Sequence, residues 1–401
     1  MNKLKKYKFD ELYDLSSGIS TSKEQAGHGF PFISFSTIFN NYFIPDTLPD
    51  LMETSRSEQE KYSVLAGDVL LTRTSETLDE LAMSSVALKD YPNATFSGFA
   101  KRLRPKHSNF PDPKFMAFYL RGSYFRRSIN SLATMTTRAS FNETLFSFLS
   151  LELPDINTQV AIGNLLFNLE KKIQANKKLN DNLAAMIKTI YEYWFVQFEF
   201  PDENGNPYKS SGGKMVWNEQ LKQNLPLGWD VLPLLDIAEL YQPKTIDTSL
   251  LSNEMCYPVY SSGGYIGNYD EFNHEDSEVI VSCRGKCGNV YRTVPNSWIT
   301  GNSMVVSPKI IGISKDYLYQ TLDFMDLERY ETGSVQKQLT RQNMSFIQVL
   351  VAERKLLEKF NNISKPITLT QIKLQNESWK LQRLRDWLLP MLMNGQATIE
   401  D

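Results

Sequence analysis

The segment IGNLLFNLEKKIQANKKLNDNLAAMIKTIYEYW, from Ile162 to Trp194, places its mostly apolar key positions alternately four and three residues apart. An average spacing of 3.5 residues is typical of a helix that packs along a second helix in a coiled coil. The segment therefore predicts one long helix with a helix-packing face, here named the first seam. The first seam consists of Ile162, Leu166, Leu169, Ile173, Asn176, Asn180, Leu183, Ile187, Ile190 and Trp194.

A partner helix is predicted near the end of the chain, where the same alternation runs from Phe360 to Met391. Polar residues fall in the middle of both seams, where a buried polar side chain can fix the register of two helices. Pro366 lacks a backbone donor, so the second helix is expected to begin or kink there. The alternative is two amphipathic helices, each packed only on its own domain. The second seam consists of Phe360, Ile363, Ile367, Thr370, Leu374, Glu377, Leu381, Leu384, Leu388 and Met391.

Each predicted helix ends one copy of a repeated pattern. The offset between copies falls from about 222 residues at the start to about 198 at the helices, which places length differences inside the globular parts. Four segments recur in the same order: YKFDELYDL (Tyr7 to Leu15, Leu12 aligned with Leu234) with WDVLPLLDI (Trp229 to Ile237), AGDVLLTR (Ala66 to Arg73) with DSEVIVSCR (Asp276 to Arg284), TFSGFA (Thr95 to Ala100) with WITGNSM (Trp298 to Met304), and LFSFLSLELP (Leu145 to Pro154) with NMSFIQVLVA (Asn343 to Ala352).

The expected fold is α+β, with two repeated α/β domains, each followed by a long helix, and the two helices paired as an antiparallel coiled coil. A chain of 401 residues has room for two such cores. No signal peptide or membrane span is recognisable, so a cytoplasmic protein is expected. The expected boundaries are 1–154 for the first domain, 155–200 for the first helical region, 201–228 for a linker, 229–351 for the second domain and 352–401 for the second helical region.

Basic residues are concentrated locally in a chain whose net charge is −3. Between Lys101 and Arg138 there are nine basic residues and one acid, Asp112. A cluster on this scale suits contact with nucleic-acid phosphates, although an ordinary solvated surface is the alternative. A weaker basic stretch in the second copy contains Arg284, Lys286, Arg292 and Lys309.

Motifs for catalysis or cofactor binding are not recognisable. The three cysteines, Cys256, Cys283 and Cys287, are expected to be free thiols, and their spacing with His274 does not favour zinc. The GGK triplet is followed by Met215, where a phosphate-binding loop needs Ser or Thr. No N-P-P-Y tetrapeptide is present, and neither a glycine-rich cofactor loop nor clustered carboxylates are recognisable, so a methyltransferase or nuclease is not supported. No metal and no cofactor are expected.

The sequence resembles the specificity subunits of type I restriction-modification systems over nearly its whole length. The resemblance lies in FEFPDENGNPYKSSGGKMVWNEQL after the first helix, PVYSSGGYIG in the second domain and GSVQKQLTRQNMSFIQVLV before the second helix. It implies two target-recognition domains, each binding one half of a bipartite site in double-stranded DNA. It also implies that the helices bind methyltransferase subunits, of which two are expected. Restriction/translocase subunits would be recruited through the resulting complex. The alternatives are a general DNA-binding coiled-coil adaptor and a DNA-modifying enzyme with atypical motifs.

Candidate DNA contacts follow from side-chain chemistry near the domain edges. Arginine pairs with guanine, and glutamine or asparagine with adenine, while any cation can contact phosphate. A helix of about 30 residues rises about 45 Å, comparable with one turn of DNA at about 34 to 36 Å, so the helices could set the distance between half-sites. The candidates are Arg73, Lys101, Arg102, Arg104, Arg126, Arg127, Thr137, Arg138, Ser261, Ser262, Gly263, Arg284, Lys286, Asn302, Gln336, Lys337, Gln338, Thr340 and Arg341.

Overall fold

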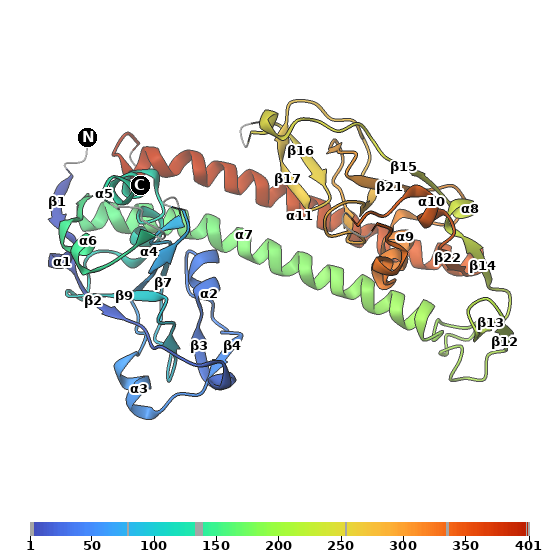
Figure 1. Ribbon diagram of the computed structural model, residues 1–401, viewed down its shortest axis with the longest axis horizontal. Helices are drawn as coiled ribbons and strands as arrows, with labels where there is room; N and C mark the ends of the chain where they lie inside the picture. Colours follow the sequence, from blue (N-terminus) through green and yellow to red (C-terminus); the bar gives the residue numbers. More distant parts are fainter. Residues whose placement is uncertain are drawn as a thin grey trace. The chain divides into compact units, whose positions relative to one another are not determined.

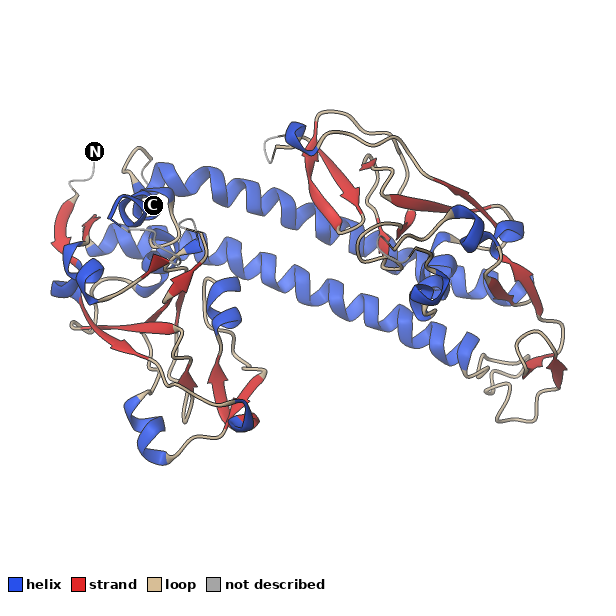
Figure 2. Cartoon of the chain, viewed as in Figure 1, coloured by secondary structure: helices blue, strands red, loops and turns tan. Residues whose placement is uncertain are grey.

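The chain divides into two compact units, Met1–Ala175 with Glu377–Asp401, and Asn176–Asn376. The computed structural model describes residues 4–77, 80–132, 139–252, 255–333, 337–397 and 399. Each unit contains one globular α/β module and part of each of the two long helices, α7 (Ile156–Tyr191) and α11 (Arg354–Met393) (Figure 1). Short strands and short helices build the modules, as Figure 2 shows by colour.

The first module is organised around a four-stranded antiparallel sheet and a smaller three-stranded sheet. The larger sheet has the order β2 (Tyr13–Ser17), β9 (Ala100–Pro105), β5 (Val69–Thr72), β7 (Ser84–Val86). The smaller has the order β4 (Asp50–Met52), β3 (Ala26–Ile33), β8 (Thr95–Phe96). Two short pairs complete the module, namely β1 (Lys5–Lys8) with β11 (Ser150–Leu153), and β6 (Thr74–Ser75) with β10 (Ala139–Ser140).

Capping residues define the helices of the first module. Asp112 accepts a hydrogen bond from the Phe115 backbone N–H at 2.8 Å, and Pro113 occupies the first turn, where a missing donor costs nothing. Asn142 caps α6 (Glu143–Phe148) in the same way, by accepting from the Leu145 N–H at 2.9 Å. The helices are α1 (Phe9–Leu12), α2 (Phe35–Asn40), α3 (Arg56–Lys61), α4 (Pro113–Tyr119), α5 (Ser123–Leu132) and α6 (Glu143–Phe148), with a 3₁₀ turn η1 (Lys23–Gln25).

The second module has the same topology. Its four-stranded sheet has the order β15 (Ala238–Tyr241), β21 (Ser303–Pro308), β18 (Val279–Ser282), β19 (Val290–Arg292). Its three-stranded sheet has the order β17 (Gly264–Tyr269), β16 (Tyr257–Ser261), β20 (Trp298–Ile299), and β14 (Asp230–Pro233) pairs with β22 (Gln348–Val351). The helical segments are α8 (Leu234–Ile237), η4 (Thr248–Leu250), α9 (Lys315–Phe324), η5 (Leu327–Tyr330) and α10 (Arg341–Ser345). The module is preceded by the π turn η3 (Glu192–Val196) and a hairpin of β12 (Met215–Asn218) and β13 (Gln223–Pro226).

The predicted duplication is confirmed by matching backbone contacts. The Phe9 N–H donates to the Leu149 carbonyl at 3.1 Å, and the Leu234 N–H donates to the Ile347 carbonyl at 2.8 Å. Phe9 therefore corresponds to Leu234, and the alignment of Leu12 with Leu234 was wrong by three residues. The error arose because α1 and α8 both carry buried apolar residues three positions apart, so that the pattern also fits when shifted by one turn.

The two long helices run antiparallel where they meet within each unit. In the first unit, the Glu170 carboxylate of α7 pairs with the Arg385 guanidinium of α11 at 2.6 Å. In the second unit, the Gln371 side-chain amide donates to the Asn180 carbonyl at 3.3 Å, and the Tyr191 and Phe360 rings lie 6.3 Å apart. Increasing numbers along α7 thus meet decreasing numbers along α11, as the sequence predicted.

The burial of α7 follows the first seam. Ile173, Asn176 and Ile187 are buried, whereas Asn180 and Leu183 are half-buried. This agrees with a helix that packs along one continuous face.

The second seam was correct in period but wrong in phase. Glu377 is exposed and 42% of the Leu384 surface is exposed, while Leu374, Leu381 and Leu388 are half-buried, as Asn180 and Leu183 are in the first seam. The more buried positions come one residue later and include Ser364, Thr368 and Arg385. Of the two alternatives predicted for Pro366, a helix start is excluded, because α11 begins at Arg354 and continues through Pro366; a kink there stays a prediction. The predicted phase was wrong because the packing face of α11 contains polar residues that are buried through hydrogen bonds. A search for apolar residues does not detect such positions.

Candidate nucleic-acid interface

Two of the charges expected to contact phosphate lie inside the first module. The Lys101 ammonium is buried on β9, where it pairs with Glu143 at 2.6 Å and donates to Ser17 Oγ at 2.9 Å. Arg102, 8% exposed, donates to the Ser63 carbonyl, and burial lowers its pKa. The expectation that these two residues belong to an exposed phosphate patch is therefore corrected. Burial of the Lys101 ammonium is tolerated because Glu143 and Ser17 accept its hydrogen bonds.

Three further arginines of the basic run bind the protein itself. Arg104 makes two hydrogen bonds to the Asp68 carboxylate, at 2.8 and 2.6 Å, and this contact raises the arginine pKa. Arg126 donates to the Leu81 carbonyl. Burial lowers the pKa of Arg121 to about 10, and its guanidinium donates to the carbonyls of Ser84, Ile38, Phe39 and Asn41. Most of the counted charge thus stabilises loops of the module.

Arg73 and Arg127 are the exposed candidates in the described part of the first module. Arg73 follows β5, and its backbone is fixed on both sides, since its N–H donates to Phe99 O at 2.7 Å and its carbonyl accepts from Phe141 N at 2.8 Å. Thr137 and Arg138 lie outside the described residues. The exposed edge at the end of β5 is therefore the best-defined candidate surface in this module.

The corresponding edge of the second module lies at the end of β18. The Cys283 N–H donates to Asn302 O at 2.9 Å, and the Cys283 carbonyl accepts from Leu339 N at 3.1 Å. These are the bonds that Arg73 makes in the first module. Arg73 therefore corresponds to buried Cys283, so the sequence alignment that paired it with Arg284 was wrong by one residue.

Four exposed candidates gather at this edge, and we name them the β18 edge cluster. Arg284 and Gln338 face each other across an antiparallel backbone bridge, Lys286 lies on the same turn as Arg284, and Lys337 precedes Gln338. The Lys337 ammonium pairs with Glu331 at 3.1 Å, and 67% of the lysine side chain remains exposed. Gln336 lies outside the described residues. The structure thus brings together residues that are about 50 positions apart in the sequence.

The remaining candidates of the second module are more dispersed. Ser261 is buried and accepts a hydrogen bond from Thr300 Oγ1 at 2.9 Å, while Ser262 is half-buried and Gly263 is exposed on the turn that follows. Asn302 is half-buried, and Arg341 is exposed at the start of α10. Thr340 caps α10 by accepting from the Asn343 N–H at 3.2 Å, which assigns its hydroxyl a structural contact.

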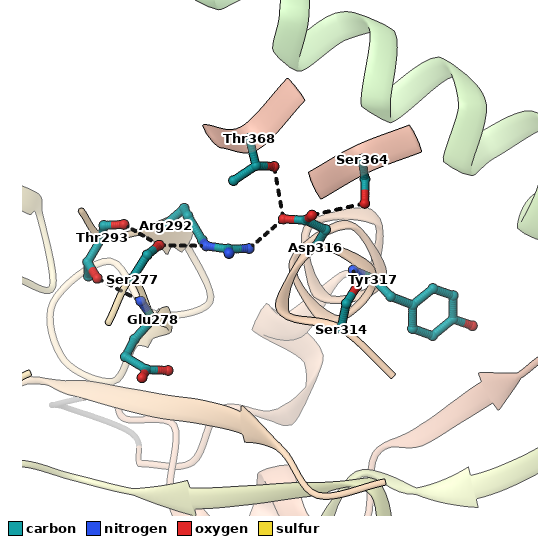
Figure 3. Close-up of polar contacts among 9 residues, drawn as sticks. All are labelled: Ser277, Glu278, Arg292, Thr293, Ser314, Asp316, Tyr317, Ser364 and Thr368. Atoms are coloured by element: carbon teal, nitrogen blue, oxygen red, sulfur yellow. Dashed lines mark hydrogen bonds and ion pairs between the residues drawn. The ribbon is translucent and has the colours of Figure 1, made fainter. Parts of the chain in front are cut away.

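Sequence reasoning missed a buried polar network that ties the second module to α11 (Figure 3). Asp316, on α9, accepts hydrogen bonds from Arg292 at 2.8 Å and from the hydroxyls of Ser364 and Thr368, both at 2.9 Å. Arg292 also donates to Ser277 Oγ at 2.8 Å. Because Arg292 ends β19, the network connects the hairpin that carries Arg284 and Lys286 to the long helix.

The first module has an anchor of opposite charge at the corresponding position. Lys114, the second residue of α4 as Asp316 is of α9, donates to Asn164 Oδ1 on α7 at 2.8 Å. No short motif marks either residue, so only the repeat could have suggested comparing them.

Buried cysteines do not offer a reactive centre in the second module. Burial raises the pKa of Cys283 to about 12 and also raises that of Cys287, which disfavours the thiolate that nucleophilic or metal-binding chemistry needs. Within the described ranges, no three His, Cys, Asp or Glu side chains are arranged to hold a metal ion. None of the helices in these ranges has the length and apolar character needed to cross a membrane.

Two α/β modules of one topology, each followed by a long helix and each with a polar edge, define a two-module binding protein that arose by duplication. Residues 1–185 and 226–353 match the type I restriction modification DNA specificity domain, and the chain belongs to this family. It is a non-catalytic specificity subunit whose function is DNA sequence recognition. A specificity subunit works within a type I restriction-modification complex, which implies methyltransferase and restriction subunits as partners.

One similar protein and one solved structure cover the chain almost completely, and a second relative covers about half of it. The MjaIX specificity subunit of Methanocaldococcus jannaschii is 19% identical, over 98% of this chain and 93% of the relative. The HindI specificity subunit of Haemophilus influenzae is 24% identical, over 47% of this chain and 40% of the relative. The crystal structure of a type I restriction-modification S subunit from M. genitalium has a TM-score of 0.59 at 18% identity, covering 98% of this chain and 96% of that one, which supports the fold.

Proposed function

We propose that this subunit reads a bipartite DNA site, with one half-site bound at the β5 edge of the first module and the other at the β18 edge of the second. The observation that carries the proposal is the duplicated backbone arrangement. Equivalent backbone hydrogen bonds fix Arg73 in the first module and Cys283 in the second. Two equivalent edges with different side chains suit two half-sites with different bases.

In the second half-site, we assign base contacts to Arg284 and Gln338. Both are exposed and adjacent across the bridge, and guanidinium and amide groups are the side chains that recognise guanine and adenine in the major groove. Lys286 and Lys337 flank them and suit phosphate contacts, which orient a protein on DNA without reading its sequence. In the first module, the exposed candidates are Arg73 at the end of β5 and Arg127 on α5.

The long helices are proposed to bind two methyltransferase subunits and to set the distance between the half-sites. At about 1.5 Å per residue, α7 with 36 residues and α11 with 40 extend about 54 and 60 Å. A helical turn of DNA measures about 34 to 36 Å, so helices of this length can hold two modules over separated half-sites.

The test is methylation of a randomised bipartite DNA library by the subunit together with its methyltransferase subunits. Gln338→Ala should change the preferred bases in one half-site only, at a cost of about 1 to 3 kcal/mol for a lost bidentate contact. Gln348→Ala, a control on the neighbouring strand β22, should leave both half-sites unchanged. If Gln338→Ala alters both half-sites or the spacer length, the two modules do not read independently.

A further inference from the structure

An exposed phenylalanine lies at the β5 edge, where one half-site is proposed to bind. Phe99 is in the turn between β8 and β9, and 63% of its surface is exposed. Its carbonyl accepts the Arg73 N–H at 2.7 Å, which continues the β5–β9 register and places Phe99 opposite Arg73. Phe99 differs in this bond to a candidate DNA contact from other exposed phenylalanines of the module, such as Phe30 and Phe148.

The turn that carries Phe99 is fixed by hydrogen bonds. The Gly98 N–H donates to the Ile19 carbonyl at 2.7 Å, and the Phe99 N–H donates to Ser97 Oγ at 3.2 Å. A Cβ at Gly98 would lie 2.9 Å from the same Ile19 oxygen, so a larger residue would displace the turn. Both backbone polar groups of Phe99 are therefore bonded, and its Cα–Cβ bond has a defined direction.

The second module has the same turn with a different residue at the exposed position. Residues 300–303 form it, and a Cβ at Gly301, as at Gly98, would meet a backbone oxygen. The Asn302 carbonyl accepts the backbone bond that fixes the end of β18, as the Phe99 carbonyl does at the end of β5. An asparagine amide can donate and accept hydrogen bonds at a base edge, whereas a phenyl ring can do neither. The two modules thus present different chemistry at equivalent positions.

The charges near the turn are compatible with DNA. Arg73 is exposed, and Lys101 on β9 pairs with Glu143 at 2.6 Å. The hydrogen bond from Lys101 and, more weakly, the charge of Arg73 lower the pKa of Glu143, so this carboxylate is ionised and offsets one of the two cations. One net positive charge remains beside the exposed ring, where it can attract the DNA backbone.

We propose that Phe99 contacts the C5 methyl group of a thymine, so that the first module selects thymine at one position of its half-site by apolar contact. This rests on the proposed function and adds the identity of one base. The thymine methyl is the apolar group that base pairs present in the major groove, and a ring without donors or acceptors can discriminate bases through it. The contact also removes apolar surface of the ring from water, which is favourable.

The test compares thymine with uracil, which lacks the methyl group, at each thymine of the site that library methylation identifies. Binding is measured by fluorescence anisotropy, with the full-length subunit in complex with its methyltransferase subunits. For the wild type, uracil at the contacted position should weaken binding about fourfold, which corresponds to about 0.8 kcal/mol for one buried methyl group. Phe99→Ala should bind the thymine and uracil sites equally. Phe99→Leu keeps an apolar side chain and should retain part of the discrimination.

Phe346→Ala is the matched control, because it removes a ring that is 69% exposed from the second module. The effect of uracil at the Phe99-dependent position should not change in this variant. The melting temperatures of all three variants should stay at the wild-type value, since the replaced side chains are exposed.

Two results would overturn the proposal. One is a site at which no thymine loses its methyl sensitivity in Phe99→Ala. The other is weaker binding of this variant with every methyl effect intact, as expected if the ring inserts between base pairs in the minor groove or contacts a protein partner. The proposed function is tested separately, since selective binding of a bipartite site by the wild type and the effect of Gln338→Ala on one half-site do not depend on Phe99.

Discussion

Asp316→Ala should destabilise the second unit by removing the acceptor at the centre of its polar network. The Asp316 side chain is 9% exposed and accepts hydrogen bonds from Arg292, Ser364 and Thr368. Removing one partner of a buried ion pair costs about 3 to 5 kcal/mol. Because the Arg292 side chain is 22% exposed and keeps Ser277 as an acceptor, we expect the lower end of the range, about 3 kcal/mol.

The effect is best measured by hydrogen exchange of peptides from α9, which report the second unit separately from the first. A loss of about 3 kcal/mol corresponds to exchange that is faster by more than about a hundredfold. Asp316→Asn keeps an oxygen acceptor for the hydroxyls and should cost about 1 to 2 kcal/mol. Lys114→Met, at the corresponding position of α4, should cost about 1 kcal/mol and affect the first unit only.

A double-mutant cycle separates the ion pair from the loss of packing. If Asp316 and Arg292 stabilise the unit through each other, Arg292→Ala and Asp316→Ala should be non-additive by about 1 to 3 kcal/mol. Additive effects within about 0.5 kcal/mol would refute the coupling of Asp316 to Arg292, and unchanged exchange in α9 would refute the role of Asp316 as the centre of the network.

The other predictions concern DNA affinity and pH. Arg127→Ala should flatten the salt dependence of DNA binding by about 0.9 in log–log slope if Arg127 contacts one phosphate, whereas an unchanged slope would remove it from the interface. Arg126→Ala should instead lower the melting temperature, because its guanidinium holds the Leu81 carbonyl; an unaltered melting temperature would contradict that. Burial, with a smaller effect of the Lys315 charge, lowers the pKa of His274 in the folded protein. The imidazole therefore binds a proton more readily in the unfolded chain, and the stability of the fold should fall as the pH drops below about 6.5. In urea unfolding at several pH values, His274→Gln should lose less stability over this range, and an identical pH dependence would count against the assignment.

The architecture could be predicted because it depends on periodicity and repetition. The first seam follows α7 through Ile173 and Ile187, which are buried, and the repeated strands recur in the same sheet order in both modules. Spacing along the chain is sufficient to predict a helix face and the recurrence of elements, whereas the order of the strands within each sheet was not predicted. The second seam could be predicted only in period, because Ser364 and Thr368 are buried through hydrogen bonds to Asp316, a residue distant in sequence.

The candidate site was harder to predict because counting charges does not reveal their partners. The run from Lys101 onward reads as a surface patch, yet Arg104 is held by Asp68 and Arg121 by carbonyls of distant loops. The β18 edge cluster was only partly foreseen. Arg284 and Gln338 were both candidates, but their pairing depends on a backbone bridge between segments that the sequence does not connect.

The two modules share equivalent backbone contacts but carry different side chains at the ends of β5 and β18. Lys106 donates to the Asp10 carbonyl at 2.7 Å and Lys309 to the Leu235 carbonyl at 2.9 Å, so even this lysine contact to the short first helix is repeated. At the ends of β5 and β18, however, identical backbone bonds carry different side chains, with Phe99 in one module where Asn302 stands in the other. The shared backbone arrangement thus presents different side chains at the two edges. A protein that reads two unlike half-sites requires this combination, and the two halves of its DNA site should therefore differ in sequence.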